Sequence, residues 1–292
     1  MAPHVKGIIF IIAGTVLWGA SGVLSQHLFN DKAVTAEWLV TARLVLSGLV
    51  LLLIDLLSCR GGIFSIWKVK KDAAALAVFG ILGMLGVQYT YFVTIVYSNA
   101  ATSTILQYLM PIVIVIYITF TTRRLPRRLD LFSIALAMFG VFLLITKGRF
   151  DTLMLSPAAL GWGLATACFA AFYTLQPRAL IRKWRSTLVI GWGMLIGGIA
   201  MLPFQPIWQF DGVFDTNFVL TFAAVVLFGT ALAFCAYLES TKYLSPTEIS
   251  VFASLEPLSS IVLSIVFLGI SFGAWELAGA AVIIAAVTLL SK

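Results

Sequence analysis

The sequence predicts an all-α membrane protein of ten transmembrane helices, built as two inverted repeats of five helices. Hydrophobic residues make up 61% of the 292 residues and charged residues only 11%, whereas soluble domains carry about 25% charged residues. Ten apolar stretches are each long enough, at about 1.5 Å per residue, to cross roughly 30 Å of hydrocarbon. Their apolarity is continuous rather than alternating and the connections are short, which excludes a β-barrel and a separate soluble domain.

The ten stretches follow one another along the whole chain. Because many similar stretches follow the first one, we expect it to be retained as a helix rather than cleaved as a signal peptide. The first five cover residues 7–24, 38–57, 73–96, 101–121 and 131–146. The second five cover residues 157–176, 187–207, 218–238, 247–268 and 272–290.

Basic residues are distributed unevenly between the two sides of this arrangement. Of the 19 Lys and Arg residues, 15 lie at the termini and in the even-numbered connections, three lie in the odd-numbered connections, and Arg43 lies inside the second stretch. Because basic loops remain in the cytoplasm, we predict a bacterial inner-membrane protein with both termini cytoplasmic. The short basic clusters do not form the continuous face that nucleic-acid binding needs, so no nucleic-acid partner is expected.

The two halves of the chain are related by a shift of 146 residues. Several residues recur at this shift, namely Gly83 and Gly229, Tyr91 and Tyr237, and Pro111 and Pro257. An odd number of helices in each repeat makes the second repeat enter the membrane from the opposite side. We therefore divide the chain into a first repeat, residues 1–147, and a second, inverted repeat, residues 148–292.

Three short motifs carry a resemblance to a known family. Trp-Gly at residues 18–19 is followed by small and polar residues, Arg43 follows Thr-Ala in the second stretch, and Glu-Pro stands at residues 256–257 in the ninth. With the overall pattern, these motifs resemble the drug/metabolite transporter superfamily, in its EamA-type ten-helix branch, over essentially the whole chain.

The resemblance implies an exporter of small metabolites that works by alternating access. The aromatic richness is most similar to that of bacterial aromatic amino-acid exporters, which implies export of amino acids, aromatic and other apolar ones among them. The sequence departs from the family pattern at two places. Met110 stands in the first repeat where the second has Glu256, and Ile270 follows Gly269 where the family has glutamate.

Glu256 is the acidic residue that the prediction places at mid-membrane. An ionised carboxylate facing lipid costs several kcal/mol, so we expect it to face the interior of the protein. Two interpretations stay open: contact with a substrate ammonium group or with protons, and a structural hydrogen-bond acceptor. Arg43 is the candidate partner, because a guanidinium can bind a carboxylate through two parallel hydrogen bonds. Alternatively, Arg43 extends toward the membrane surface.

Aromatic and neutral polar residues recur at helical spacing in several stretches. Helix packing, lipid contact and interhelical hydrogen bonds explain such residues as readily as a binding site does. If the stretches meet at the interface between the repeats, their side chains can stack on an organic substrate. The expected substrate-binding residues are Trp18, Ser21, Gln88, Tyr91, Gln107, Trp162, Phe169, Tyr173, Tyr237 and Glu256.

Pro111 and Pro257 fall in the middle of the fourth and ninth stretches. Each proline removes a helical hydrogen bond, so the pair is a candidate for symmetric hinges, with plain packing as the alternative.

Other functions fit the sequence less well. Ser21 lies in a Gly-Ala-Ser-Gly run similar to that of rhomboid proteases, but His27 is only six residues away in the same stretch and cannot serve as its base. We expect no enzyme activity, cofactor or metal site. The rings of charge typical of channels are also missing. The expected partners are a small-molecule substrate and membrane lipid, for a monomer or weak homodimer. Efflux of organic cations and transport of nucleobases stay open as alternatives.

Overall fold

The computed structural model describes residues 3–59, 62–123, 127–147, 155–240, 242–244 and 246–290. Within these ranges every regular element is a helix, which confirms the all-α prediction. Four residues of the charge count, Arg60, Arg124, Arg149 and Lys292, lie outside the described residues, as does the start of the second repeat at residue 148.

The helices follow the apolar stretches closely. The first half of the chain forms α1 (Pro3–Lys32), α2 (Ala36–Cys59), η1 (Ser65–Lys68), α3 (Lys70–Val78), η2 (Phe79–Leu85), α4 (Gly86–Tyr97), α5 (Ala100–Gln107), α6 (Met110–Thr122) and α7 (Arg128–Thr146). The second half forms α8 (Pro157–Leu175), α9 (Arg178–Lys183), α10 (Ser186–Met201), α11 (Thr216–Val226), η3 (Leu227–Leu232), α12 (Ala233–Ser240), α13 (Pro246–Ala253), α14 (Leu255–Leu268) and α15 (Ala274–Leu290). In the described part of the chain, six helical stretches are long and apolar enough to cross a membrane, and α10, α14 and α15 are shorter apolar helices.

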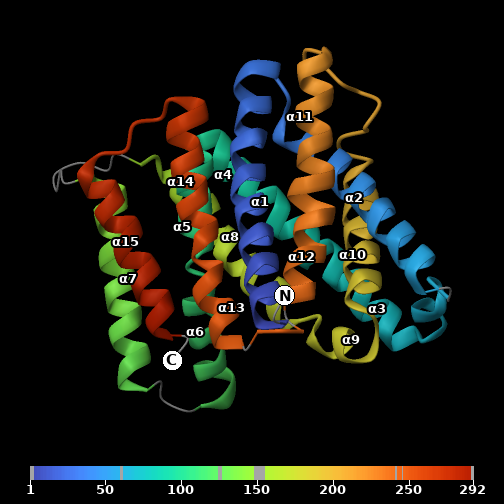
Figure 1. The fold of residues 1–292 in the computed structure, drawn as a ribbon, viewed down its shortest axis with the longest axis horizontal. Coiled ribbons are helices and arrows are strands. Elements are labelled where there is room, and N and C mark those ends of the chain that lie inside the picture. Colours follow the sequence, from blue (N-terminus) through green and yellow to red (C-terminus); the bar gives the residue numbers. More distant parts are fainter. Residues whose placement is uncertain are drawn as a thin grey trace.

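Two helix pairs flank a central group of helices. α2 packs along α10 on one side, and α7 packs along α15 on the other, with α1, α8, α12 and α14 between them (Figure 1). Both pairs cross at glycines. A Cβ atom at Gly48 of α2 would lie 2.9 Å from the Gly191 carbonyl oxygen, and one at Gly140 of α7 would lie 2.9 Å from that of Gly279. Only residues without a side chain permit such close backbone approach.

The two termini lie at the same end of the bundle. α1 begins and α15 ends near the lower edge of the view, where α9 and the start of α3 also lie (Figure 1). Basic residues gather on these segments, among them Lys70, Lys71, Arg182 and Lys183. The charge distribution predicts that this end faces the cytoplasm.

Two of the long segments contain a π-helical turn. η2 separates α3 from α4, and η3 separates α11 from α12. When η2 is shifted by the 146 residues that relate the two halves of the sequence, it overlaps η3. π-helical turns are rare and recur at functional sites because they leave backbone groups outside the regular hydrogen-bond ladder.

The structure corrects several predicted boundaries. α1 extends beyond residues 7–24 at both ends. α10 ends at Met201 rather than at residue 207, because Pro203 and Pro206 follow and lack the N–H groups that a helix needs. Stretches 101–121 and 247–268, predicted as single helices, are each interrupted shortly before their proline.

Polar contacts tie the helices together at their ends. At the lower end, Asp55 of α2 accepts hydrogen bonds from the Arg185 guanidinium, at 2.6 and 2.9 Å, and from the Thr187 hydroxyl, at 2.6 Å. At the upper end, Lys147 lies 2.8 Å from Glu276 of α15.

Candidate functional site

Two helix breaks place polar residues in the interior of the bundle. Tyr108 and Leu109 lead from α5 into α6, and Ser254 leads from α13 into α14. Pro111 and Pro257 then lie in the first turn of the new helix, where a missing N–H leaves no partner unsatisfied. The break before α14 makes Glu256 the second residue of that helix.

The side chains around Glu256 come from five helical segments. They form what we call the central aromatic cluster, which consists of Trp18, Tyr91, Tyr108, Tyr173, Tyr237 and Glu256. The Glu256 carboxylate interacts electrostatically with the hydroxyl groups of all four tyrosines. All six members are half-buried.

Further contacts hold the cluster in place. The Trp18 ring lies 5.0 Å from the Tyr237 ring, and Gly19, next in sequence, approaches the backbone of Glu256 and Ser260 so closely that no side chain fits there. The Tyr91 hydroxyl is 2.9 Å from the Thr104 hydroxyl.

The first and second halves of the chain meet within this cluster. Tyr108 shares a hydrogen bond with Ser254, and these two break residues correspond to each other at the shift of 146 residues. Equivalent positions of the two halves therefore touch directly at the cluster.

The predicted pairing of Arg43 with Glu256 is wrong, and so is its extension to the membrane surface. Arg43 is 5% exposed, its Nε donates to the Thr230 hydroxyl at 2.8 Å, and its Nη2 donates to the Gly229 carbonyl at 3.3 Å. Its guanidinium also lies 5.2 Å from the centre of the Phe92 ring. Both acceptors belong to the π-helical turn η3, so Arg43 joins α2 to this turn.

Ser21 of α1 packs against Gly229 in the same turn. It is 2% exposed, and its hydroxyl has no hydrogen-bond partner among the described residues. Ser21 lies beside the Gly229 carbonyl that Arg43 binds, where only a small side chain fits. The Ser21 hydroxyl does not belong to the central aromatic cluster.

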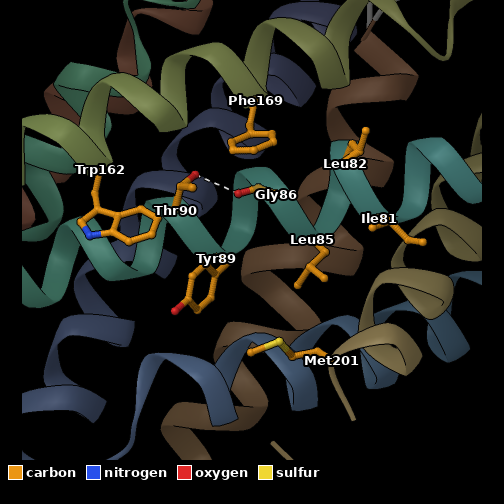
Figure 2. A pocket seen from close by; sticks show the side chains of 9 residues that line it. All are labelled: Ile81, Leu82, Leu85, Gly86, Tyr89, Thr90, Trp162, Phe169 and Met201. Carbon is orange, nitrogen blue, oxygen red and sulfur yellow. Dashed lines mark hydrogen bonds between the residues drawn. The ribbon is translucent and has the colours of Figure 1, made fainter. Parts of the chain in front are cut away.

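Trp162 and Phe169 line a lateral pocket of about 320 Å³ (Figure 2). Both rings point from α8 toward α4, where the Phe169 ring lies over Gly86 and the Trp162 ring meets Tyr89 edge to face at 5.8 Å. Glu256 and the tyrosines near it are not part of the pocket lining. The complete lining is Ile81, Leu82, Leu85, Gly86, Tyr89, Thr90, Trp162, Phe169 and Met201.

The two predicted glutamines border the central aromatic cluster in sequence. Gln88 precedes Tyr91 by three residues on α4, and Gln107 directly precedes Tyr108. Both are half-buried, and neither side chain has a polar partner in the described part of the chain.

A second lateral pocket, of about 430 Å³, lies between α1, α11 and α14. None of the predicted site residues lines it. Its polar edge is formed by His27 and Asn217, whose side chains are 3.0 Å apart.

Sequence reasoning missed Tyr108 and Tyr89. Tyr108 lies three residues before Pro111, so the candidate hinge at this proline was the available signal. Tyr89 donates a hydrogen bond to Glu37 at 3.3 Å, a contact between separate helices that spacing within one helix does not reveal.

The exterior of the fold defines its class. Large apolar side chains such as Phe120, Met138 and Phe267 are mostly exposed on the outer helices, where water would disfavour them and lipid would not. With six helices able to span a membrane, the chain is a multi-pass membrane protein.

The chain belongs to the EamA-like transporter family, which matches residues 5–146 and 157–292. It is 38% identical to the uncharacterized inner membrane transporter YicL of Salmonella typhimurium over 98% of this chain and 95% of that protein. It is 24% identical to the threonine/homoserine exporter RhtA of Escherichia coli K12, covering 96% of this chain and 88% of RhtA. The protein is thus an inner-membrane transporter of this family.

A solved crystal structure shares the fold. Its TM-score is 0.66 at 17% sequence identity, and the match covers 98% of this chain and 97% of that one. The expected likeness to the aromatic amino-acid exporter YddG stays a prediction, because the relatives described above are YicL and RhtA.

Proposed function

We propose that the protein exports amino acids, aromatic and other apolar ones among them, together with related small metabolites. The central aromatic cluster carries this proposal, because it places five aromatic side chains and one carboxylate where the two halves of the chain meet. Aromatic rings stack on apolar side chains and attract cations, and a carboxylate complements an ammonium group. The exporter function that RhtA carries in its name supports amino acids as the substrate class.

In our proposal, transport follows alternating access between two inverted five-helix repeats, residues 1–147 and 148–292, with both termini in the cytoplasm. Two family matches of similar length, one in each half, support this division. The helix breaks before Pro111 and Pro257 make these prolines the proposed hinges. Transporters built from such repeats bind substrate between them, near the bilayer midplane.

The proposed substrate site includes all of the predicted residues, with Tyr108 added. Gln88 and Gln107 lie close in sequence to members of the central aromatic cluster, and Ser21 lies three residues after Trp18 on α1. Trp162 and Phe169 line the pocket one to three helical turns along α8 from Tyr173. This extended aromatic surface predicts broad rather than strict selectivity.

Transport in proteoliposomes tests the function. Labelled threonine, homoserine, phenylalanine and tryptophan should be carried, with and without a pH gradient imposed. A nucleobase and a quaternary organic cation represent the alternative functions, and transport of either one without the amino acids would refute the proposal.

Substitutions of the two tryptophans test the site. Trp18→Ala and Trp162→Ala should each lower phenylalanine and tryptophan transport by roughly two- to tenfold more than threonine transport, since an aromatic contact contributes about 0.5–1.5 kcal/mol. Equal losses for all substrates would indicate packing roles instead.

A further inference from the structure

Glu256 differs from every other acidic residue on the described helices. The side chains of Asp31, Glu37, Asp55, Asp72, Asp130, Glu239, Glu248 and Glu276 each have a polar side-chain or backbone partner. The Glu256 carboxylate has neither a hydrogen-bond partner nor a basic neighbour among the described residues, although protein surrounds it. A buried carboxylate in this situation is costly unless something else supplies the positive charge.

The aromatic residues around Glu256 suit a cation. Electron-rich ring faces attract an ammonium group, and the attraction grows where water is excluded. Trp18 and Tyr237 form one wall of the central aromatic cluster, with ring centres 5.0 Å apart, and Tyr108 and Tyr173 add two more rings.

The same region offers little to a negative group. Arg43 is the one basic side chain that the structure places deep within its described helices, and it is committed to Thr230 and the Gly229 carbonyl. The Phe92 ring lies over its guanidinium. A substrate carboxylate would therefore have to displace protein contacts to reach Arg43.

We infer that the central aromatic cluster recognises the ammonium group of its substrate, through Glu256, and makes no ion pair with the carboxylate. This inference rests on the proposed function, since it specifies how that site binds amino acids. It extends the ligand class to primary amines that lack a carboxylate.

Ligand binding to the purified full-length protein tests the inference without transport. Phenylalanine, phenethylamine and phenylpropionate share one ring but carry both charges, the ammonium only and the carboxylate only. Each affinity can be measured from ligand-induced stabilisation against thermal unfolding. Phenethylamine should bind within about threefold of phenylalanine and phenylpropionate at least about tenfold more weakly, since a charge-assisted contact is lost only in the last case.

Variants assign the effect to Glu256. Glu256→Gln should weaken phenylalanine and phenethylamine by about tenfold or more, and Glu256→Asp, which keeps the charge, should retain most of the binding. Glu276→Gln is the matched control, because Glu276 has its own partner in Lys147, lies outside the central aromatic cluster and should leave both affinities unchanged. If Glu256→Gln fails to fold, Glu256→Asp still tests the site, because it should keep most of the affinity for both amines while phenylpropionate stays the weakest ligand.

Three results overturn the inference: phenylpropionate binding as tightly as phenylalanine, loss of binding when only the carboxylate is absent, or unchanged phenethylamine affinity in Glu256→Gln. Failure of the proposed function looks different. In that case phenylalanine does not bind while phenethylamine does, or none of the three ligands binds.

Discussion

The α2/α10 pair and the α7/α15 pair use the same glycine crossing but are anchored differently. Trp38 at the start of α2 donates to the Ile207 carbonyl after α10, and Trp192 of α10 donates to the Ile63 carbonyl after α2, at 2.9 and 2.7 Å. The contact between the buried Asp55 and Arg185 adds a third tie. The α7/α15 pair has the Lys147–Glu276 contact at one end.

The two pairs also belong to different hydrophobic cores. The larger core contains α2 and α10 together with parts of α1, α4 and α11, whereas the smaller one joins α7 and α15 to α5 and α6. The comparison teaches that close packing and rigid anchoring are separate properties. We expect α2/α10 to serve as a fixed frame and α7/α15 to tolerate small displacements.

The largest expected effect removes the Asp55–Arg185 ion pair of the frame. Arg185→Met leaves the Asp55 carboxylate, which has no exposed surface, with only a neutral partner in Thr187. Because Arg185 itself is 39% exposed, we expect the free energy of unfolding in detergent to fall by about 3 kcal/mol, the upper end for a buried acceptor that loses its partner. Lys183→Met is the control, because Lys183 is half-exposed in its pair with Asp72. An equal loss in the two variants would contradict the special role of Arg185.

The glycine crossings offer a direct comparison of the pairs. Gly48→Ala and Gly140→Ala each place a methyl group against backbone, at 2.7 Å from the Leu195 nitrogen and 2.9 Å from the Gly279 oxygen. We expect Gly48→Ala to cost about 1–3 kcal/mol of unfolding free energy, because the anchored pair cannot separate. Gly140→Ala should cost less. The comparison fails if Gly140→Ala is equally or more damaging under the same denaturant titration.

The tie of the α7/α15 pair should contribute less than that of the frame. Glu276→Gln removes the charge facing Lys147, which is 40% exposed, but keeps an acceptor for the Gly273 N–H. We expect a loss of about 0.5–1 kcal/mol in unfolding free energy, near the upper range for partly exposed pairs. A double-mutant cycle with Lys147→Met measures the pair itself. A coupling as large as that of Asp55 and Arg185 would remove the distinction between the two pairs.

The ion pair of Lys32 and Asp215 lies outside both helix pairs and gives the smallest expected effect on stability. The hydrogen bond from Lys32, and then that from the Phe218 N–H, hold the pKa of Asp215 below its usual value. The stabilisation is therefore present above the unfolded pKa of about 3.9 and is lost as the pH falls through the lower folded value. The melting temperature should drop slightly more below about pH 4 in the wild type than in Asp215→Asn. Parallel curves would exclude this contribution.

Much of the fold can be predicted from the length and spacing of the apolar stretches alone. The helices lie where the hydrophobic stretches predict them, and the basic segments gather at one end. The π-helical turns were not predicted, since a single extra residue in a helical turn leaves no mark on an apolar run. The division of stretches 101–121 and 247–268 had a visible signal in the prolines, but a proline alone does not separate a kink from a break.

The candidate site was only partly predictable. Glu256 and the aromatic residues near it were expected from depth in the membrane and helical spacing. The sequence pairs Arg43 with Glu256 because their charges are opposite, whereas its actual partners, the Thr230 hydroxyl and the Gly229 carbonyl, come together only in the folded turn. Tyr108 was missed because its neighbour Gln107 offered the more obvious polar group.

The paired π-helical turns also set the phase of the helices that follow. A π turn contains one residue more than an α turn would, and one residue corresponds to a rotation of about 100° around the helix axis. A residue added to a regular α-helix would rotate every later side chain by that angle, whereas the π turn η2 holds its additional residue within one turn, so Tyr91 keeps the phase that brings it near Glu256. Since η3 precedes Tyr237 in the same way, both halves carry the same angular offset. Their sequences can then be compared through these turns without a gap, and an insertion in one half alone would disrupt the cluster without altering its composition.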